Sequence, residues 1–446
     1  MALDALKGWT SAQKHVVAAS YLGWTLDAFD FFLLVFVLKD VAAEFHAPLA
    51  TVTVALTLTL GFRAVGAFIF GRLADRFGRR PVLMADVAAY SLLAFATAFS
   101  PNLIGFFVLR ALFGVAMGGE WGVGASLTME TIRPQARGIV SGLLQSGYPC
   151  GYLLASLVFY VLYPHIGWRG MFMVGVIPAL LILYIRRHVP ESPGWQKQKK
   201  AQASLAGMPE IGMLVLYLAS FIAAMLLLGG LGVWSFAITL IPMVAAVIYF
   251  RGHRAIALFA IVLMAAFNFF SHGTQDLYPT FLQVQRHFDH ATVSLIAIVY
   301  NVGAIAGGIL FGMLSQRFGR RKMMAVTAVL AVVVSPLWVF APSALLLGVG
   351  AFVMQFFVQG CWGIVPAYLN EISPPDARGT FPGTVYQLGN FLAASNAPIQ
   401  AAVAASFAGR YSIGLISVAV ISAVVIAALT LVGREAREAD LGAAKT

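Results

Sequence analysis

Charged residues are scarce in this sequence. Asp, Glu, Lys and Arg make up 11% of the 446 residues, whereas hydrophobic residues make up 60%. Soluble domains carry about 25% charged and about 45–50% apolar residues. The low charge excludes an ordinary soluble globular protein and predicts a polytopic membrane protein.

Cysteine is nearly absent, and so is the alternating pattern of a membrane β-barrel. Cys150 and Cys361 both fall in predicted helices and imply no disulfide framework. Apolar runs such as residues 211–250 are continuous and lack the period of two that barrel strands show. We therefore expect an all-α bundle of membrane-spanning helices.

Signatures of enzyme chemistry are also missing. The histidines are scattered, no pair has metal-ligand spacing, and no glycine-rich phosphate loop follows a strand. We predict neither a metal site nor a cofactor, and we expect a carrier rather than an enzyme. A substrate sensor that no longer transports is an alternative.

The positive charge that is present records topology. The formal net charge of +11 gathers in clusters that alternate with loops nearly free of Lys and Arg, at residues 72–80, 133–137, 186–200, 251–254, 317–322 and 434–437. By the positive-inside rule, these basic loops face the cytoplasm. The charge therefore argues against nucleic acid as a partner. With no cleavable signal before the first helix, both termini are expected inside, and the location is the plasma membrane, or the inner membrane of a bacterium.

The chain contains an internal repeat. "GRLADRFGRR" from Gly71 returns as "GMLSQRFGRR" from Gly312, and "ETIRPQARG" from Glu130 returns as "EISPPDARG" from Glu371, a shift of 241 residues in both cases. A constant shift predicts two homologous bundles of about six helices each, as in transporters built from parallel repeats. We expect the bundles at residues 1–190 and 254–446, with a linker segment at 191–253.

Two further apolar runs lie between the halves. Residues 211–229 and 231–250 are each close to the ~20 residues that span a bilayer. They predict an extra hairpin, which brings the total to about fourteen helices. Alternatively, these segments lie in the membrane without crossing it.

The repeated motif "GRLADRFGRR" resembles the signature loop between the second and third helices of the major facilitator superfamily, and "RALFGVAMGGE" from Arg110 is similar to its fourth-helix signature. The glycines permit close helix approach, and Asp75 with nearby arginines can hold one half against the other. Gln316 replaces this aspartate in the second copy, which predicts a weaker latch there. The candidate gating residues are Gly71, Asp75, Arg76, Gly78, Arg79, Gly312, Arg317, Gly319 and Arg320. A role in topology and folding alone is the alternative.

A second stretch narrows the resemblance. "NFFSHGTQDLYPT", from Asn268 to Thr280, resembles the seventh-helix signature of fungal lactate and pyruvate proton permeases. "GWTLDAFDFF" from Gly23 and the central hairpin resemble a bacterial group that includes sialic acid proton symporters. Both resemblances imply a carboxylate carried together with protons.

The residues of this stretch support a transport site independently. Asn268, His272 and Asp276 are four apart and share one helix face, with Gln275 adjoining. Ionisable groups inside a membrane are costly and normally face a cavity or a partner. We expect Asn268, near the midplane, to bind substrate together with His272 and Gln275, and Asp276 to lie nearer the outer mouth. A packing network without a transport role is the alternative.

The first half is expected to supply charge to the same site. Asp27 and Asp30 share a face of the first helix, and Arg63 in the second helix comes to a similar depth. An arginine fork matches a carboxylate, so Arg63 is the candidate anion ligand, unless it forms a permanent salt bridge. Asp27, Asp30, Asp276 and Glu120 are candidate proton carriers, although Glu120 suits a structural role equally well.

These observations predict a proton-coupled symporter for a small organic anion, most simply a monocarboxylate such as lactate or pyruvate. It would work in the lipid bilayer as a monomer, by rocking of two six-helix bundles. Sialic acid or another carboxylate is an alternative substrate. A proton-driven drug exporter is a weaker alternative, because buried Arg63 would suit a lipophilic cation poorly.

Overall fold

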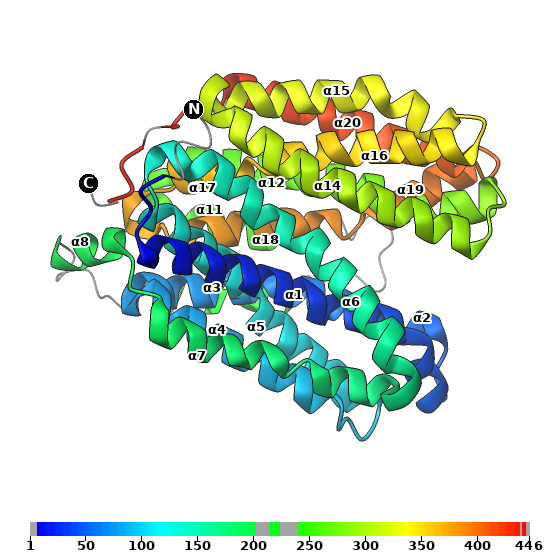
Figure 1. Ribbon diagram of the computed structural model, residues 1–446, viewed down its shortest axis with the longest axis horizontal. Coiled ribbons are helices and arrows are strands. Elements are labelled where there is room, and N and C mark those ends of the chain that lie inside the picture. Colours follow the sequence, from blue (N-terminus) through cyan, green and yellow to red (C-terminus); the bar gives the residue numbers. More distant parts are fainter. Residues whose placement is uncertain are drawn as a thin grey trace.

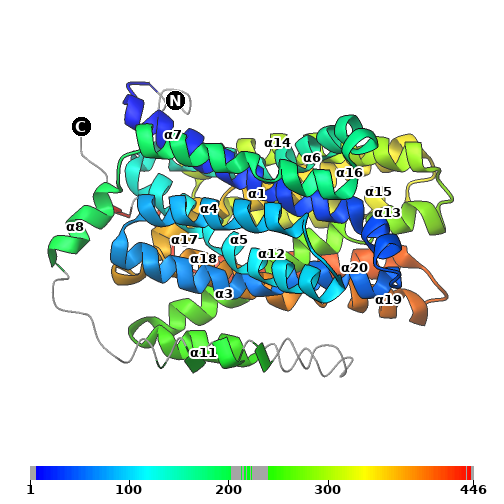
Figure 2. The same ribbon diagram turned by 90° about the horizontal axis from the view of Figure 1, so that it is seen from below.

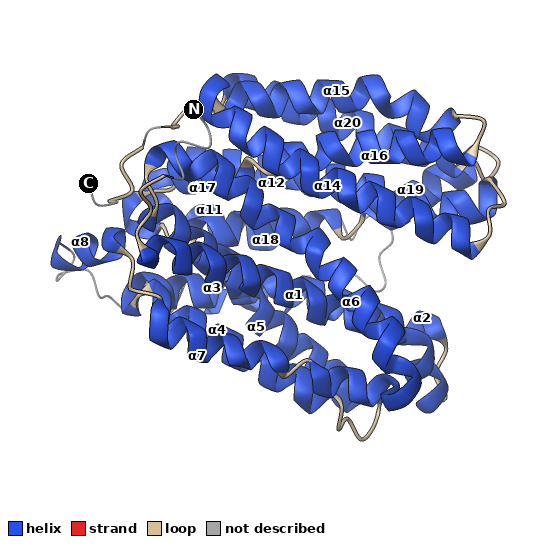
Figure 3. Ribbon diagram, in the orientation of Figure 1, coloured by secondary structure: helices blue, strands red, loops and turns tan. Residues whose placement is uncertain are grey.

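A computed structural model describes residues 7–201, 212, 215–216, 218–220, 222–223, 240–437 and 439–442 of the chain. Its regular structure over these residues is entirely helical (Figure 3). Nine helical stretches in the described part are long and apolar enough to cross a membrane. The predicted all-α class is therefore confirmed, whereas the count of about fourteen helices stays a prediction.

Helices of the first half are α1 (Ser11–Glu44), α2 (Leu49–Val52), α3 (Val54–Phe77), α4 (Arg79–Thr97), α5 (Leu103–Thr131), α6 (Arg137–Val174), α7 (Leu180–His188) and α8 (Pro193–Ala201). Within α6, Gly167 has a φ of 62° and divides the element into two helices. Only glycine adopts this left-handed conformation without strain. The break lets the segment after Gly167 run back toward α7.

The second half continues from α11 (Leu240–Tyr249) through α12 (Arg254–Gln275), α13 (Tyr278–Thr280), α14 (His290–Phe318), α15 (Arg320–Phe340), α16 (Ala344–Trp362), α17 (Val365–Ile372), α18 (Phe381–Ala393), α19 (Asn396–Ser406) and α20 (Tyr411–Val432). Figure 1 shows the two groups of helices meeting at the left and diverging to the right. We call the left end, where the described N-terminal and C-terminal segments both lie, the basic end.

Helix boundaries in the two halves repeat with the sequence shift. The α3–α4 junction at Gly78 corresponds to the α14–α15 junction at Gly319, and these glycines have φ values of 111° and 98°. Short 3₁₀ turns follow at Pro134–Ala136 and Pro375–Ala377, again 241 residues apart. Each junction requires a positive φ, so the glycine of the repeated motif fixes the corner between two helices.

Asp75 joins the two halves at the basic end. Its carboxylate accepts hydrogen bonds from the Gly379 amide (2.7 Å), the Thr380 amide (2.9 Å) and the Thr380 hydroxyl (2.5 Å). The same carboxylate accepts one from Arg79 at 3.0 Å. A Cβ atom on Gly71 would lie 2.7 Å from the Cα of Thr380, so glycine is required for this approach. The basic end is closed by this contact.

The equivalent contact of the second copy is thinner. Gln316 accepts one hydrogen bond from the other half, from the Gly138 amide at 3.2 Å, and a second from Arg320 at 2.7 Å. Close backbone approach is retained, because a Cβ on Gly312 would lie 2.6 Å from the carbonyl oxygen of Gly138. The hydrogen bonds are fewer on this side, as the glutamine substitution leads one to expect.

The remaining candidate gating residues divide into two groups. Arg79 and Arg320 are fully buried and bind Glu130 and Glu371 at 3.0 and 2.9 Å. By contrast, Arg76 and Arg317 are exposed and lie over the rings of Phe77 and Phe318, both at 5.2 Å. The structure brings the first pair into the packed junctions and leaves the second pair outside them.

The first run of the predicted hairpin, 211–229, and residues 231–239 of its second run lie largely outside the described residues. The remainder of the second run forms α11, which packs against α12 and α18. Tyr249 contacts Phe68 of α3, with ring centroids 4.8 Å apart. In Figure 2, α11 lies along one side of the bundle.

Asp75→Ala should loosen the basic end more than Gln316→Ala. The first change removes three hydrogen bonds between the halves and the second removes one. We expect hydrogen exchange at the Gly379 and Thr380 amides to accelerate about tenfold in Asp75→Ala, because a hydrogen bond to a charged acceptor is lost. Hydrogen-exchange mass spectrometry measures the acceleration of amide exchange at the contacts between the halves. An equal acceleration in Asp75→Ala and Gln316→Ala would contradict the prediction that the contact of the first copy is the stronger one.

Candidate functional site

The centre of the site is an ion pair between the second and first long helices. Arg63 of α3 is 1% exposed and Asp27 of α1 is fully buried. Arg63 Nη2 donates to Asp27 Oδ2 at 3.2 Å, while Arg63 Nε is buried without a hydrogen-bond partner. The guanidinium carbon lies 5.6 Å from the centre of the Trp24 ring. The predicted proximity of Arg63 and Asp27 is confirmed, and the guanidinium keeps unused donor capacity.

Aromatic side chains from both halves lie near this pair, since Tyr148 and Tyr386 are within electrostatic range of Arg63. Trp24 and Tyr148 lie 5.4 Å apart in the first half. Tyr386 of α18 contacts Trp121 of α5 at 4.5 Å and Trp362 of α16 at 5.4 Å, so its ring bridges the two halves. Trp121 and Trp362 are themselves equivalent under the 241-residue shift. The rings provide an apolar and polarisable boundary around one buried cation.

Three further buried carboxyl groups lie in the first half. Asp30, Asp86 and Glu120 are at most 1% exposed, and none of their carboxyl oxygens has a hydrogen-bond partner among the described residues. Glu120 lies against α1, where a Cβ on Gly23 would come within 2.3 Å of its Oε1 atom. Glycine at position 23 therefore makes room for the carboxyl group. Burial of a carboxyl group without a hydrogen-bond partner is costly, which makes these three groups candidates for a functional role.

Arg110 is the second buried cation of this half. It is fully buried in α5, lies 3.9 Å from the Phe113 ring centre, and has two guanidinium nitrogens without a partner. Asp30 is within its electrostatic range. Sequence reasoning did not single out Arg110 or Asp86 as site residues. Each is an ionisable residue within an apolar run of the sequence, and this is the signal that could have identified it.

The polar face of α12 is held by amide side chains of the second half. Asn268 is 2% exposed and donates to the Met264 carbonyl of its own helix at 2.8 Å. His272 lies 3.0 Å from Asn390 and 3.1 Å from Asp276. Asp276 also accepts from Asn396 at 3.3 Å. Exposure rises along this face from buried Asn268 to exposed Asp276.

Gln275 belongs to a separate set of contacts. Its amide donates to Gln355 of α16 at 2.8 Å, and Gln355 in turn donates to Thr274 at 3.0 Å. Gln359 of the same helix donates to Ser271 at 3.3 Å. The structure therefore places Gln275 toward α16, whereas His272 and Asp276 face α18 and α19. The amide side chains that bind these residues belong to Gln355, Gln359, Asn390 and Asn396. They were not identified from the sequence, although each lies within an apolar helix.

Charge is unequally divided between the repeats. Under the shift of 241 residues, Arg63, Asp86, Arg110 and Glu120 correspond to Ala304, Thr327, Ala351 and Cys361. Asp27 and Asp30 correspond to Asn268 and Ser271. At these six positions the first half carries charged residues and the second half carries neutral ones, of which Asn268, Ser271 and Thr327 have hydrogen-bonding side chains.

Comparison with protein families identifies the family of this chain. The family model for the Major Facilitator Superfamily matches residues 21–275 and 258–446. The chain belongs to the major facilitator superfamily. It is therefore a multi-pass membrane transporter rather than an enzyme, and superfamily members carry small molecules through a lipid membrane.

Relatives and solved structures extend this result. A carboxylic acid transporter protein homolog of Saccharomyces cerevisiae is 28% identical over 86% of this chain, and the chain spans 60% of that relative's length. The sialic acid transporter NanX of Escherichia coli is 24% identical, over 90% of this chain and 89% of that protein. The structure of the proton:xylose symporter XylE superposes with a TM-score of 0.67 at 18% identity, covering 93% of this chain and 95% of that one. The last similarity concerns the major facilitator fold alone.

The buried ion pair makes a direct prediction about stability. Arg63→Gln leaves the Asp27 carboxylate without its counter-charge and should lower the free energy of unfolding by about 3 kcal/mol. Adding Asp27→Asn should restore most of this loss, because neither charge then remains buried. Thermal unfolding in detergent measures both variants. Additive losses in the double variant would show that the two groups are not coupled.

Proposed function

We propose that this transporter is a proton-coupled symporter for a small organic anion, most simply a monocarboxylate of the lactate or pyruvate type. The observation that carries the proposal is Arg63, a buried guanidinium with unused donor capacity. It lies in an aromatic environment to which both halves contribute. A guanidinium fork binds a carboxylate bidentately, and removal of water strengthens that interaction.

In this proposal, the substrate carboxylate competes with Asp27 for Arg63. The single hydrogen bond of 3.2 Å between them is weaker than a bidentate pair, so exchange of partners costs little. The ion pair of Arg63 with Asp27 is then the state of the site without substrate. The alternative is that this ion pair is a permanent salt bridge that never binds substrate. Asn268, His272 and Gln275 are proposed to supply hydrogen bonds to the substrate from the second half.

Proton coupling is proposed to use Asp30 or Asp27. Asp30 is the better placed of the two to hold a proton, because its oxygens are buried without hydrogen-bond partners while Asp27 is paired with Arg63. Glu120 has equally unpartnered oxygens and remains a candidate. Asp276 is bound to His272 and Asn396, which favours a role in holding His272 or the outer gate.

Alternating access would follow from rocking of the two bundles, which we assign to residues 1–190 and 254–446, with 191–253 as linker and hairpin. The contacts between the halves at Asp75, Gly71, Gln316 and Gly312 would have to open in the opposite state, whereas the ion pairs of Arg79 and Arg320 lie within one half each and would stay intact. The basic end is proposed to face the cytoplasm, with both termini there, in the plasma membrane or a bacterial inner membrane. We propose that the monomer is the functional unit.

Other carboxylates are alternative substrates, which an uptake experiment can distinguish. The names of the carboxylic acid and sialic acid relatives support a carboxylate without selecting one. The aromatic lining favours an acid with a flat apolar body as a second candidate. Export of lipophilic cations is disfavoured, because Arg63 would repel them.

Uptake into proteoliposomes tests the proposal. With the outside more acidic, we expect labelled lactate or pyruvate to accumulate, and competition by pyruvate, nicotinate, muconate and sialic acid to rank the substrate classes. Arg63→Lys should reduce affinity about tenfold or more, because lysine keeps the charge but loses the fork. Exposed Arg410 supplies the control, since Arg410→Lys should not change affinity. Absence of carboxylate uptake, or unchanged affinity in a folded Arg63→Lys variant, would refute the assignment.

Asp30→Asn tests the coupling separately. The variant should still exchange substrate across the membrane without a gradient, because the arginine site is intact. It should fail to accumulate substrate in response to a pH gradient, because the proton carrier is lost. Asp27→Asn is compared in parallel. If both variants keep accumulation driven by the pH gradient, neither aspartate carries the proton, and Glu120 and Asp276 become the candidates to examine.

A further inference from the structure

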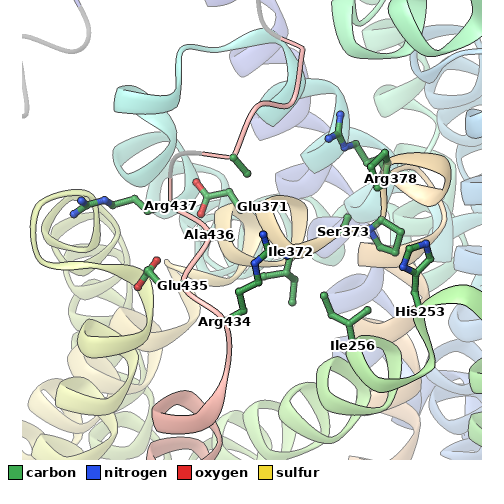
Figure 4. Close-up of a pocket in the computed structure, with 13 residues that line it drawn as sticks. His253, Ile256, Glu371, Ile372, Ser373, Arg378, Arg434, Glu435, Ala436 and Arg437 are labelled. Atoms are coloured by element: carbon green, nitrogen blue, oxygen red, sulfur yellow. The ribbon is translucent and has the colours of Figure 1, made fainter. Parts of the chain in front are cut away.

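We propose that a cavity at the basic end binds a small oxyanion, with phosphate or carboxylate oxygens, and that the bound anion fastens the C-terminal segment to the body of the protein. The cavity has a volume of about 580 Å³. It is lined by the start of α12, by the segment from the end of α17 through the following 3₁₀ turn, and by residues of the C-terminal segment (Figure 4). It is separate from the site around Arg63.

Arginine side chains supply positive charge to the lining. Arg378, Arg434 and Arg437 contribute to the walls, together with His253, which lies 3.5 Å from Asp376. In Figure 4, Arg434 rises from the C-terminal segment toward Ile372, with His253 on the opposite side. Oxyanions are bound best where several such donors converge. A cavity lined in this way provides both the volume and the charge for an anion.

One of the two carboxylates of the lining is paired with arginines outside the cavity. Glu371 is bound by Arg320 through two hydrogen bonds of 3.0 and 2.9 Å, and Arg137 lies 4.0 Å away. Glu435 accepts from the backbone amide of Arg321 at 3.2 Å, which carries no charge, so Glu435 remains an acidic group of the lining. Against this one carboxylate the lining has three arginines, so it keeps surplus positive charge.

Arg378 shows that the positive charge is only partly satisfied. Its Nη2 atom donates to the Asp440 carbonyl at 3.0 Å, but its Nε atom is buried without a partner. Burial lowers the pKa of the Arg378 guanidinium, which is the cost of a cation removed from water. An anion in the cavity would offset that cost.

The C-terminal segment is positioned to transmit binding to both halves. Arg137 of the first half donates to the Ala439 carbonyl at 2.7 Å, and Arg437 donates to the Arg317 carbonyl of the second half at 3.0 Å. Leu441 is 1% exposed within an apolar cluster that includes Val17 and Met129. An anion that binds Arg434 would therefore hold the C-terminal segment in place across the basic end, where the two halves are in contact.

Two sources could supply this chemistry, a free anion of the cytoplasm or the phosphate of an anionic lipid. The test uses the full-length protein in nanodiscs of phosphatidylcholine, with inorganic phosphate as the probe, and in nanodiscs containing phosphatidylglycerol without phosphate. Calorimetry measures phosphate binding. Hydrogen-exchange mass spectrometry measures protection of the amides of residues 439–441.

We expect phosphate to bind and to slow exchange at residues 439–441. Arg434→Gln should weaken binding about tenfold or more, because one charge-assisted contact is lost. Arg434 is exposed, so the variant should fold, and Arg410→Gln serves as the matched exposed control outside the cavity. Arg378→Gln should weaken binding in the same direction.

Protection that appears only with phosphatidylglycerol, and that Arg434→Gln removes, would assign the site to a lipid headgroup and support the oxyanion chemistry. The proposal is overturned if neither phosphate nor phosphatidylglycerol protects residues 439–441. It is also overturned if Arg434→Gln and Arg410→Gln bind the probe equally well. Because no transport is measured, these outcomes are independent of the symport proposal.

Discussion

A charged group inside a membrane has little access to water, so the protein itself must balance it. The first half meets this requirement at two levels. At the centre, Arg63 is paired with Asp27. At the basic end, buried Arg79 lies between Asp75 and Glu130, at 3.0 Å from each. Helices α1, α3, α4 and α5 are arranged so that these partners meet, and the aromatic and amide groups of the second half complete the surroundings.

The close approach of the halves depends on residues without side chains. Gly122 and Gly383 face each other across the interface, where a Cβ on Gly122 would lie 2.7 Å from the Cα of Gly383. Gly142 approaches the second half in the same way, since a Cβ on Gly142 would lie 2.3 Å from the carbonyl oxygen of Gly308. In the absence of a hydrophobic driving force between membrane helices, such small residues permit the tight packing that holds them together.

Much of the fold could be predicted from the sequence, because composition, periodicity and the repeated motif are local properties of the chain. The shift found between Gly78 and Gly319 predicts corresponding helix corners, and the structure has them. The pairing of Arg63 with Asp27 also followed from depth along two helices. The orientation of Gln275 toward Gln355 could not be derived in this way, since spacing on α12 does not specify which neighbour each face meets. Arg110 and Asp86 were missed because their significance depends on which buried groups lie around them. The path of the C-terminal segment depends on contacts with Arg137 and Arg378, far away in sequence.

The unequal division of charge between the repeats has an electrical consequence. A membrane potential of 100 mV does about 2.3 kcal/mol of work on each elementary charge that crosses it. At the positions equivalent to Arg63, Asp86, Arg110 and Glu120, the second half carries only neutral residues. Rocking of that half therefore carries no charge of its own from these positions through the field. In the proposed symport cycle, voltage would act through the first half, the proton and the cargo. A carrier that loads one carboxylate with one proton would then move a neutral load, and its direction would be set by concentrations rather than by the membrane potential.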